Sequence, residues 1–466
     1  MNPESNSLRK ESAILILILI SSFIFYLYIL TRYPLIYGID GPYYLIQVRS
    51  LLESGRLKYG DPPLAFLIFT FFTLIVGGDI TLGIRVGLAI FSALTALPLY
   101  LWMKQITHSP LSGYVAMVAC IFSAPHIRLM NDLLKNSVGA FFLLCFIYYL
   151  HCSSFNRTKK SMFFAAFFLI LTGATHILDF GVALLFLFLY PLIACFIGED
   201  WKSIVKTPGI LSLVVLVFAI SAFVVFPSFF TDFYKGLAFL RDLFTETSET
   251  NPMGFIFEPS GGLFIIPILA TGVVLSFYEW RTKKRETALA ISTVTIVGVF
   301  LSLPFIPQEW LWRFLLMEFI PIAFVLGFAV SKIKRKLISA IFLLLCLLPL
   351  VLQGVATSKT IKPTIREVDY HELEFIGSFI PSNSVIVGDL RLGYWVQYIT
   401  NCNIAKKLSH ELWENYEHVL ILIDKLSLRV PPIPPGATKI IEAKHFVLYE
   451  LRPPPPFCLL SKSDSF

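Results

Sequence analysis

Three short segments of the sequence combine acidic side chains with turn-forming residues, and each lies in a loop between long apolar stretches. They are residues 37–44 with Asp40, residues 128–132 with Asp132, and residues 247–252 with Glu249. A carboxylate beside hydrocarbon costs free energy, so it tends to be paired, bound to a metal or used in catalysis. The alternative for each segment is a carboxylate that only marks the end of a membrane span. The three segments taken together favour a functional site.

The composition is that of a membrane protein. Of the 466 residues, 56% are hydrophobic and 15% are charged, and the mean hydropathy is +0.74. Soluble globular proteins carry roughly 25% charged residues. One protein core cannot hide so much apolar surface, so lipid must be the solvent for much of the chain. The net charge of +7 comes from basic residues in short clusters between apolar runs, a pattern of membrane topology that argues against nucleic-acid binding.

Eleven apolar runs are long enough, alone or with flanking turns, to cross about 30 Å of hydrocarbon as helices. They are residues 13–30, 80–103, 111–124, 137–150, 162–175, 180–197, 210–226, 263–277, 287–303, 314–330 and 337–351. One further run, residues 64–76, has 13 residues and would measure about 20 Å as a helix. Whether this run crosses decides the topology of everything that follows it.

Residues 64–76 are predicted to lie at the outer interface or to form a re-entrant helix. In that case the basic clusters all fall on one side of the membrane, and the positive-inside rule makes this side the cytoplasm. If the run crossed, every cluster after the N-terminal one would move outside. The prediction is therefore a multi-pass protein of the cell membrane with about eleven spans, a cytoplasmic N-terminus and an extracytoplasmic C-terminus.

Two domains are expected, a transmembrane domain over residues 1–355 and an extracytoplasmic domain over residues 356–466. The topology places the outer loops at residues 31–79, 125–136, 228–262 and 304–313. The C-terminal domain has a helix-like stretch and short apolar runs of strand type, interleaved with proline-rich turns. The helix-like stretch is residues 367–380, and the strand-type runs are residues 385–387, 419–423 and 439–449. This pattern predicts a small α/β domain.

The outer loops resemble those of the GT-C membrane glycosyltransferases. Residues 40–55 resemble the first outer loop of that superfamily, in which an Asp opens an interfacial helix, and residues 59–64 resemble the acidic and proline-containing segment that leads into a second one. Residues 247–252 resemble the Ser-x-Ser-Glu-His-Gln-Pro motif of oligosaccharyltransferase catalytic subunits. Arg313-Phe314, followed by Ile320-Pro321, resembles the Arg-Phe and Val-Pro pairs of a late span in the same proteins.

Two departures separate this sequence from the oligosaccharyltransferases. Their C-terminal domain carries a Trp-Trp-Asp-Tyr-Gly motif that reads the acceptor Ser or Thr, and the corresponding residues 387–395 lack it. In the second acidic segment, Asp132 is followed by leucines and Lys135 in place of a second acid. The resemblance therefore implies a GT-C transferase without implying transfer to an Asn-x-Ser/Thr sequon.

The resemblance implies a donor in which a sugar is linked to a polyprenyl (dolichyl-type) phosphate or pyrophosphate. Asp40 is then the candidate general base toward an acceptor on a protein, a lipid or a glycan, in an inverting transfer. Arg313 is the first candidate for contacting the donor phosphate, because a guanidinium matches phosphate oxygens in a bidentate way. Arg128 and Lys135 are weaker candidates for the same contact.

The resemblance also implies further substrate and metal ligands. Asp61 and Tyr44 are candidates for binding substrate, and Asp61 could instead only cap the helix that follows it. Asp40, Asp132 and Glu249 together could hold Mg²⁺ or Mn²⁺, since carboxylate oxygens are hard ligands and a metal helps a pyrophosphate to leave.

Two other classes of function stay open. One is a transporter or flippase for a lipid-linked or small substrate, against which stand the scarcity of ionisable residues in mid-membrane and the lack of matching Gly/Pro-broken helices in two halves. The other is a membrane scaffold with a degenerate site, which the missing motif of the C-terminal domain keeps open.

Overall fold

A computed structural model describes residues 3–38, 40–198, 201–225, 238, 241, 262–303, 306–388, 392–426, 433 and 436–453. These residues fall into two compact units. One unit comprises Met1–Gly38 and Val48–Lys362, and the other comprises Ile39–Gln47 and Pro363–Phe466. The segment Ile39–Gln47 therefore belongs with the C-terminal part of the chain, although the sequence places it in the first loop.

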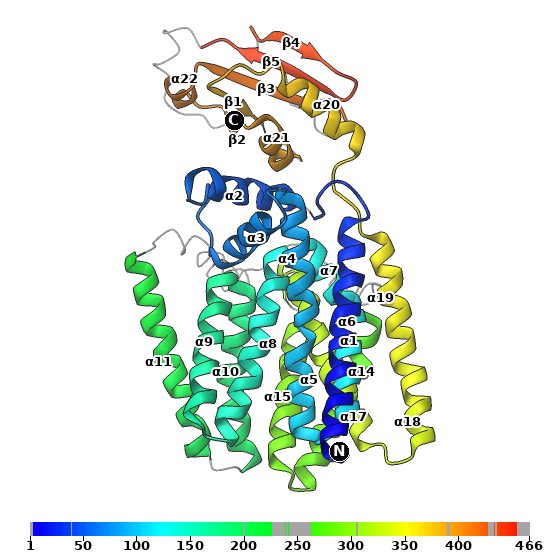
Figure 1. The fold of residues 1–466 in the computed structure, drawn as a ribbon. Helices are drawn as coiled ribbons and strands as arrows, with labels where there is room; N and C mark the ends of the chain where they lie inside the picture. Colours follow the sequence, from blue (N-terminus) through cyan, green and yellow to red (C-terminus); the bar gives the residue numbers. More distant parts are fainter. Residues whose placement is uncertain are drawn as a thin grey trace. The chain divides into compact units, whose positions relative to one another are not determined.

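The first unit is a bundle of long apolar helices (Figure 1). Each of the eleven apolar runs overlaps at least one helix of this unit. These are α1 (Pro3–Thr31), α4 (Ile80–Leu94) with α5 (Ala96–Thr107), α6 (Pro110–Phe122), α8 (Leu134–Phe155), α9 (Lys159–Thr175), α10 (Ile177–Ile197), α11 (Trp201–Val225), α14 (Gly262–Arg281), α15 (Arg285–Leu301), α17 (Phe319–Lys332), and α18 (Lys336–Phe342) with α19 (Leu348–Thr360). Among the described residues, seven helical stretches are by themselves long and apolar enough to cross a membrane. The polytopic helical fold is confirmed, and its physical basis is that a helix satisfies all its backbone groups internally in lipid.

The first helix runs antiparallel to the α4–α5 stretch. Near one end of the bundle, Lys104 forms an ion pair with Glu11, and the Tyr100 hydroxyl donates to the same carboxylate at 2.6 Å. Near the other end, the Arg85 guanidinium donates to the backbone carbonyls of residues 33–35 at 2.8–2.9 Å. The chain between α1 and α4 thus leaves and re-enters the bundle at the same end. Helix α3 (Leu64–Ile75) has 12 residues and a length of about 18 Å, which is short for a crossing, and its position at the outer interface stays a prediction.

The basic clusters gather at the end of the bundle that holds Glu11. Gln105 accepts from Cys152 at 3.0 Å, and His151 contacts Glu286 at 3.0 Å, which ties the ends of α5 and α8 to the start of α15. An ion pair of 2.6 Å between Lys332 and Glu279 joins the ends of α17 and α14. The turns that carry residues 157–160, 281–285 and 332–336 follow these helix ends. One-sided basic charge is the pattern on which the predicted cytoplasmic side rests.

Short helices occupy the opposite end of the bundle. Helix α3 packs on α4 through glycines: a Cβ at Gly83 would lie 2.3 Å from the Thr73 hydroxyl oxygen, and one at Gly87 would lie 2.8 Å from the Phe72 ring. Helix α7 (Ala124–Asp132) follows α6 after a bend of 48°. The short elements α16 (Gln308–Leu315) and η2 (Leu316–Glu318) precede α17, and η2 packs against α7. The π-helical element η3 (Leu343–Leu347) lies between α18 and α19 in the chain.

The second unit contains a five-stranded sheet in the order β2-β1-β3-β5-β4. Its strands are β1 (Ser384–Val387), β2 (Asn403–Ala405), β3 (His418–Asp424), β4 (Thr438–Glu442) and β5 (Phe446–Leu451). Strands β2, β1 and β3 run parallel, and β5 pairs antiparallel with both β3 and β4. The helices of the domain are α20 (Glu367–Gly377), α21 (Gly393–Thr400) and α22 (Glu411–Asn415). The small α/β domain that the sequence predicted is confirmed.

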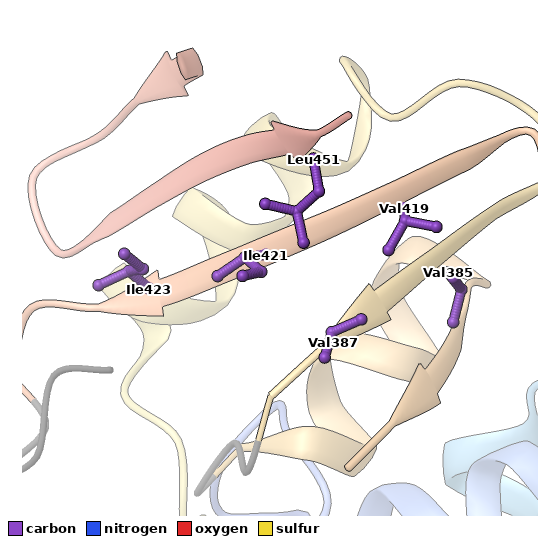
Figure 2. Close-up of a cluster of buried hydrophobic side chains, with 6 residues drawn as sticks. All are labelled: Val385, Val387, Val419, Ile421, Ile423 and Leu451. Carbon is purple, nitrogen blue, oxygen red and sulfur yellow. The ribbon is translucent and has the colours of Figure 1, made fainter. Parts of the chain in front are cut away.

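Alternate residues of the central strands make the core on one face of this sheet. Figure 2 shows its six buried side chains, Val385, Val387, Val419, Ile421, Ile423 and Leu451. Successive side chains of a strand point to opposite faces, so Ile386 and Leu420, which are also buried, face the other side. Burial on both faces explains why these strands are continuous apolar runs.

Candidate functional site

Helix α7 presents a paired carboxylate at its C-terminal end. The Arg128 guanidinium lies 3.3 Å from the Asp132 carboxylate, one helical turn away, and the Asn131 side-chain amide donates to the other carboxylate oxygen at 2.5 Å. Both partners of the ion pair are partly exposed, with side-chain exposures of 32% and 25%. Asp132 therefore stands at the loop end of the bundle with its charge partly balanced, and Arg128 is held beside it.

The first loop meets the second loop at a glycine. Gly38 has a φ of +79°, and a Cβ at this position would lie 2.5 Å from the backbone oxygen of Asn131. The preceding residue, Tyr37, is buried and donates through its hydroxyl to the carbonyl of Ile29 at 2.8 Å, and burial raises the pKa of this phenol. Only glycine fits both the backbone conformation and the close approach. The chain two residues before Asp40 is thus fixed against the residue that precedes Asp132.

Asp61 and Lys135 form a buried ion pair at the same end of the bundle. The Lys135 ammonium lies 2.6 Å and 2.5 Å from the two carboxylate oxygens, and the residues are 6% and 2% exposed. Lys135 belongs to the first turn of α8, and Asp61 lies just before α3, so the pair holds the α3 segment against α8. The substrate-binding role predicted for Asp61 and the phosphate contact predicted for Lys135 both stay predictions.

The next residue of α8, Asn136, is also polar and buried. The Asn136 amide contacts Nδ1 of His176 at 2.8 Å, and the same nitrogen accepts from the backbone of Leu178 at 3.1 Å, so His176 caps the start of α10. Asp179, on that first turn of α10, is fully buried against Gly139, and its carboxylate lies 4.0 Å from His176. Among the residues that the structure describes, neither carboxylate oxygen of Asp179 has a hydrogen-bond partner. The signal for Asn136 in the sequence is a polar amide at the start of an apolar run.

Arg313 lies on α16 with aromatic rings on two sides. Its guanidinium carbon is 5.3 Å from the ring centroid of Trp310 and 5.4 Å from that of Trp312, which are cation–π distances. The Nε atom is buried, and it has no hydrogen-bond partner in the described parts of the chain. Beyond η2, Phe319 stacks on the buried His126 of α7 at 4.6 Å. Arg313 therefore precedes a helical turn that packs against the helix carrying Arg128 and Asp132.

Asp40 immediately precedes helix α2 (Gly41–Ser54), in the segment that belongs to the second unit. The backbone N–H of Tyr44 donates to the Asp40 carbonyl at 3.2 Å, which closes the first turn. Tyr44 itself is buried, and the neighbouring Tyr43 hydroxyl accepts from the Gln47 amide at 2.9 Å. The start of α2 thus brings the Asp40 carboxylate close in sequence to two adjacent aromatic residues, Tyr43 and Tyr44.

The third acidic segment, residues 247–252 with Glu249, lies outside the described residues. Within the described ranges, no three His, Cys, Asp or Glu side chains come together as a metal site would require. The predicted metal site of Asp40, Asp132 and Glu249 is therefore neither supported nor contradicted, and it stays a prediction.

Solved structures with the same fold were found by comparing the three-dimensional structures, while no protein-family model and no curated protein matches the sequence. The archaeal oligosaccharyltransferase AglB from Archaeoglobus fulgidus, in complex with an inhibitory peptide and a dolichol-phosphate, matches with a TM-score of 0.62 and 11% identity, over 87% of this chain and 69% of that one. A structure of the Archaeoglobus fulgidus oligosaccharyltransferase in complex with Zn and sulfate matches with a TM-score of 0.61 and 13% identity, over 87% and 67%.

ArnT from Cupriavidus metallidurans, bound to undecaprenyl phosphate, matches over nearly the whole length of both chains. Its TM-score is 0.61 and its identity 11%, over 94% of this chain and 97% of that one. The match covers the helical bundle and the C-terminal domain alike, which are the parts that the sequence resemblance predicted. The chain described here therefore has the GT-C fold that it shares with AglB and ArnT.

Proposed function

We propose that this chain is a membrane glycosyltransferase that moves a sugar or glycan from a polyprenyl-phosphate-linked donor to an acceptor on the extracytoplasmic face of the membrane. The observation that carries the proposal is the match along 94% of this chain with ArnT, which was solved with undecaprenyl phosphate bound. AglB was solved with a dolichol-phosphate, which is a lipid of the same chemical type. Function depends on the site as well as on the fold, so the residues at the loop end must supply the chemistry.

Asp40 is assigned the role of general base. In an inverting transfer, its carboxylate takes the proton from an acceptor hydroxyl while the acceptor oxygen bonds to the anomeric carbon. The bond between that carbon and the phosphate oxygen breaks in the same displacement, and the polyprenyl phosphate leaves with the electron pair. The half-buried setting of Asp40 at the start of α2 supports this assignment.

Arg313 is assigned to the phosphate that leaves. Its Nε is buried, with no hydrogen-bond partner among the described residues, and Trp310 and Trp312 restrict its guanidinium, so an anion has a ready donor there. Charge-assisted hydrogen bonds from a guanidinium to phosphate are strong and directional. Arg128 is the second candidate, although part of its charge is balanced by Asp132. The displacement of polyprenyl phosphate requires only residues of this chain. A bound Mg²⁺ or Mn²⁺ would add Lewis-acid stabilisation of the phosphate.

The acceptor is a protein, a lipid or a glycan. Residues 387–395 lack the motif with which oligosaccharyltransferases read Ser or Thr of a sequon. A hydroxyl acceptor fits a single carboxylate base better than an amide does, because the amide nitrogen has a delocalised lone pair and its N–H is too weakly acidic for a carboxylate to deprotonate. We therefore favour a hydroxyl on a lipid or a glycan.

The test uses purified full-length protein in detergent, with a panel of radiolabelled undecaprenyl-phospho-hexoses as donors and a total membrane lipid extract as acceptor. The wild type should release undecaprenyl phosphate and transfer label to acceptor for at least one donor. Asp40→Asn should lose this turnover, because an amide cannot take the proton. Glu53→Gln, an exposed carboxylate further along the same helix, is the matched control and should retain it.

Equal turnover by Asp40→Asn and wild type would remove Asp40 from its role. If no donor in the panel is consumed, while vesicles that contain the protein move an undecaprenyl-phospho-hexose across the membrane, the transporter alternative takes the place of this proposal.

A further inference from the structure

The start of helix α2 and the C-terminal domain form one compact unit, although about 320 positions of sequence separate them. Residues Ile39–Gln47 cluster with Pro363–Phe466 and not with the rest of the first loop. The candidate base, Asp40, is part of this segment. The C-terminal domain therefore has a physical connection to the turn that carries Asp40.

The connection is a pair of aromatic rings. The ring centroids of Tyr43 on α2 and Tyr394 on α21 are 5.2 Å apart, and the rings are tilted by 57°. This separation lies in the range of favourable aromatic pairs. Tyr43 is fixed from its own helix as well, since its hydroxyl accepts from the fully buried Gln47 at 2.9 Å. Tyr394 therefore packs on a side chain whose position is set within the first turns of α2.

Tyr394 is not part of the core of its own domain. The next residue, Trp395, is 2% exposed, and its indole N–H donates to the Thr364 hydroxyl at 3.2 Å, whereas Tyr394 is 40% exposed. Trp395 also packs edge-on against Tyr370, with 5.8 Å between ring centroids. Helix α21 is thus anchored by Trp395, and the ring of Tyr394 can be removed without opening the domain.

A carboxylate that acts as a base must be held in a narrow range of positions, because a displacement of about 1 Å can cost a hundredfold in rate. The Tyr44 N–H bond to the Asp40 carbonyl ties Asp40 to the turn on which Tyr43 sits. A contact that limits the motion of Tyr43 therefore also limits the motion of the Asp40 backbone.

We propose that Tyr394 is a positioning residue, through which the C-terminal α/β domain orders the turn of α2 that carries Asp40. The residue acts through Tyr43 and is not assigned a contact with substrate. This inference rests on the proposed function for the catalytic meaning of Asp40, while the ordering of the turn can be measured without any activity.

The first measurement is hydrogen–deuterium exchange of peptides that cover residues 40–47, on full-length protein in detergent. Tyr394→Ala should speed exchange of these amides by about threefold to tenfold, the effect of losing an ordinary aromatic pair. Tyr394→Phe keeps the ring and should exchange like the wild type. The control is Phe379→Ala, which removes an exposed aromatic ring of the same domain that pairs with Phe375, and it should leave these peptides unchanged.

The second measurement is steady-state transfer with the donor identified above. Tyr394→Ala should lower kcat by about tenfold or more with KM for the donor nearly unchanged, because misplacement of a base affects the chemical step. Tyr394→Phe should restore kcat, and Phe379→Ala should match the wild type. A general loss of fold would instead lower the melting temperature of Tyr394→Ala and alter exchange throughout the domain.

Unchanged exchange of residues 40–47 in Tyr394→Ala would overturn the inference, whatever the activity. Faster exchange with an unaltered kcat would overturn it as well, since the ordering would then have no effect on Asp40 as a base. If the wild type consumes no donor, the proposed function fails, and the exchange data alone still decide whether Tyr394 orders the turn.

Discussion

Gly38 packs against the backbone oxygen of Asn131 so closely that a single added carbon would lie 2.5 Å from it. This contact joins the first two loops of the bundle, and it lies two residues before Asp40 and one before Asp132. The two loops touch here through the backbone of Gly38 and the backbone of Asn131. A side chain at position 38 would therefore push the loops apart.

The first prediction is that Gly38→Ala lowers transfer activity strongly. The φ of +79° and the clash with Asn131 both oppose an alanine, so the first loop must shift away from α7. Gly77→Ala is the matched control, because Gly77 has a φ of +84° and no atom within 4 Å of an added Cβ. Both variants carry the backbone strain of about 1–2 kcal/mol, so a difference between them in turnover isolates the contact. Similar turnover in the two variants would show that the contact does not matter for the site.

The second prediction concerns the buried pair of Asp61 and Lys135. Lys135→Met should destabilise the protein by about 3–5 kcal/mol, since it leaves a buried carboxylate without its ammonium partner. Thermal unfolding in detergent measures the loss as a lower melting temperature. The double variant Asp61→Leu with Lys135→Met removes both charges and should recover part of the loss. Lys439→Met, at an exposed ion pair with Glu442, should show no comparable change.

The outcome that contradicts this prediction is additivity. If the losses of stability of Asp61→Leu and Lys135→Met add up to the loss of the double variant, the two side chains are not coupled, and the pair does not hold α3 against α8.

The third prediction is that Arg313 binds the phosphate of the donor lipid. Arg313→Ala should weaken binding of undecaprenyl phosphate by about ten- to a hundredfold, the effect of losing charge-assisted hydrogen bonds. Arg313→Lys should recover only part of the affinity, because an ammonium cannot form the bidentate contact. Native mass spectrometry of the detergent-solubilised protein gives the bound fraction. Arg281→Ala, an exposed arginine at the basic end of the bundle, is the control, and an affinity for Arg313→Ala equal to that of this control would remove Arg313 from the site.

The fourth prediction follows from the acidic segments of the sequence. If Asp40, Asp132 and Glu249 hold Mg²⁺ or Mn²⁺, then EDTA abolishes transfer and added Mn²⁺ restores it. Glu249→Gln should raise the Mn²⁺ concentration that gives half of the maximal rate. Full activity in EDTA after dialysis would assign the leaving phosphate to arginine alone.

The fifth prediction concerns sidedness. The basic clusters gather at the end of the bundle that holds Glu11, and Arg32 binds the carbonyls of Ser358 and Ile361 at the other end, so α19 ends on the side away from these clusters. An epitope inserted after Lys283 should therefore be cytoplasmic, and one inserted after Gly77 should be extracytoplasmic. Digestion of sealed, right-side-out vesicles with an impermeant protease should remove only the second. Removal of the Lys283 epitope would reverse the orientation.

The membrane fold could be predicted from the sequence because the physics of lipid is local. A long apolar run has few options other than a helix, since unpaired backbone groups are costly in hydrocarbon. Basic residues between the runs then indicated which segments cross and predicted that residues 64–76 do not; in the structure this run forms the 12-residue helix α3. In the C-terminal domain, the runs of residues 385–387 and 419–423 became β1 and β3, and the run of residues 439–449 became the hairpin of β4 and β5.

Two short elements of the C-terminal domain could not be predicted from the sequence, because short stretches carry little periodicity. Strand β2, Asn403–Ala405, has three residues and no apolar alternation, and its place in the sheet comes from pairing with β1. Helix α21, Gly393–Thr400, has only eight residues, which is too short for a clear helical period in the sequence.

The site could be assembled only in three dimensions. The sequence determined which residue types stand in the loops, and so it named Asp40, Asp132 and Arg313 as candidates. The tertiary structure decided that Asp61 is bound by Lys135, 74 positions away, and that Tyr394 packs on Tyr43. Contacts of this kind depend on how helices close long loops, and no short stretch of sequence carries that information.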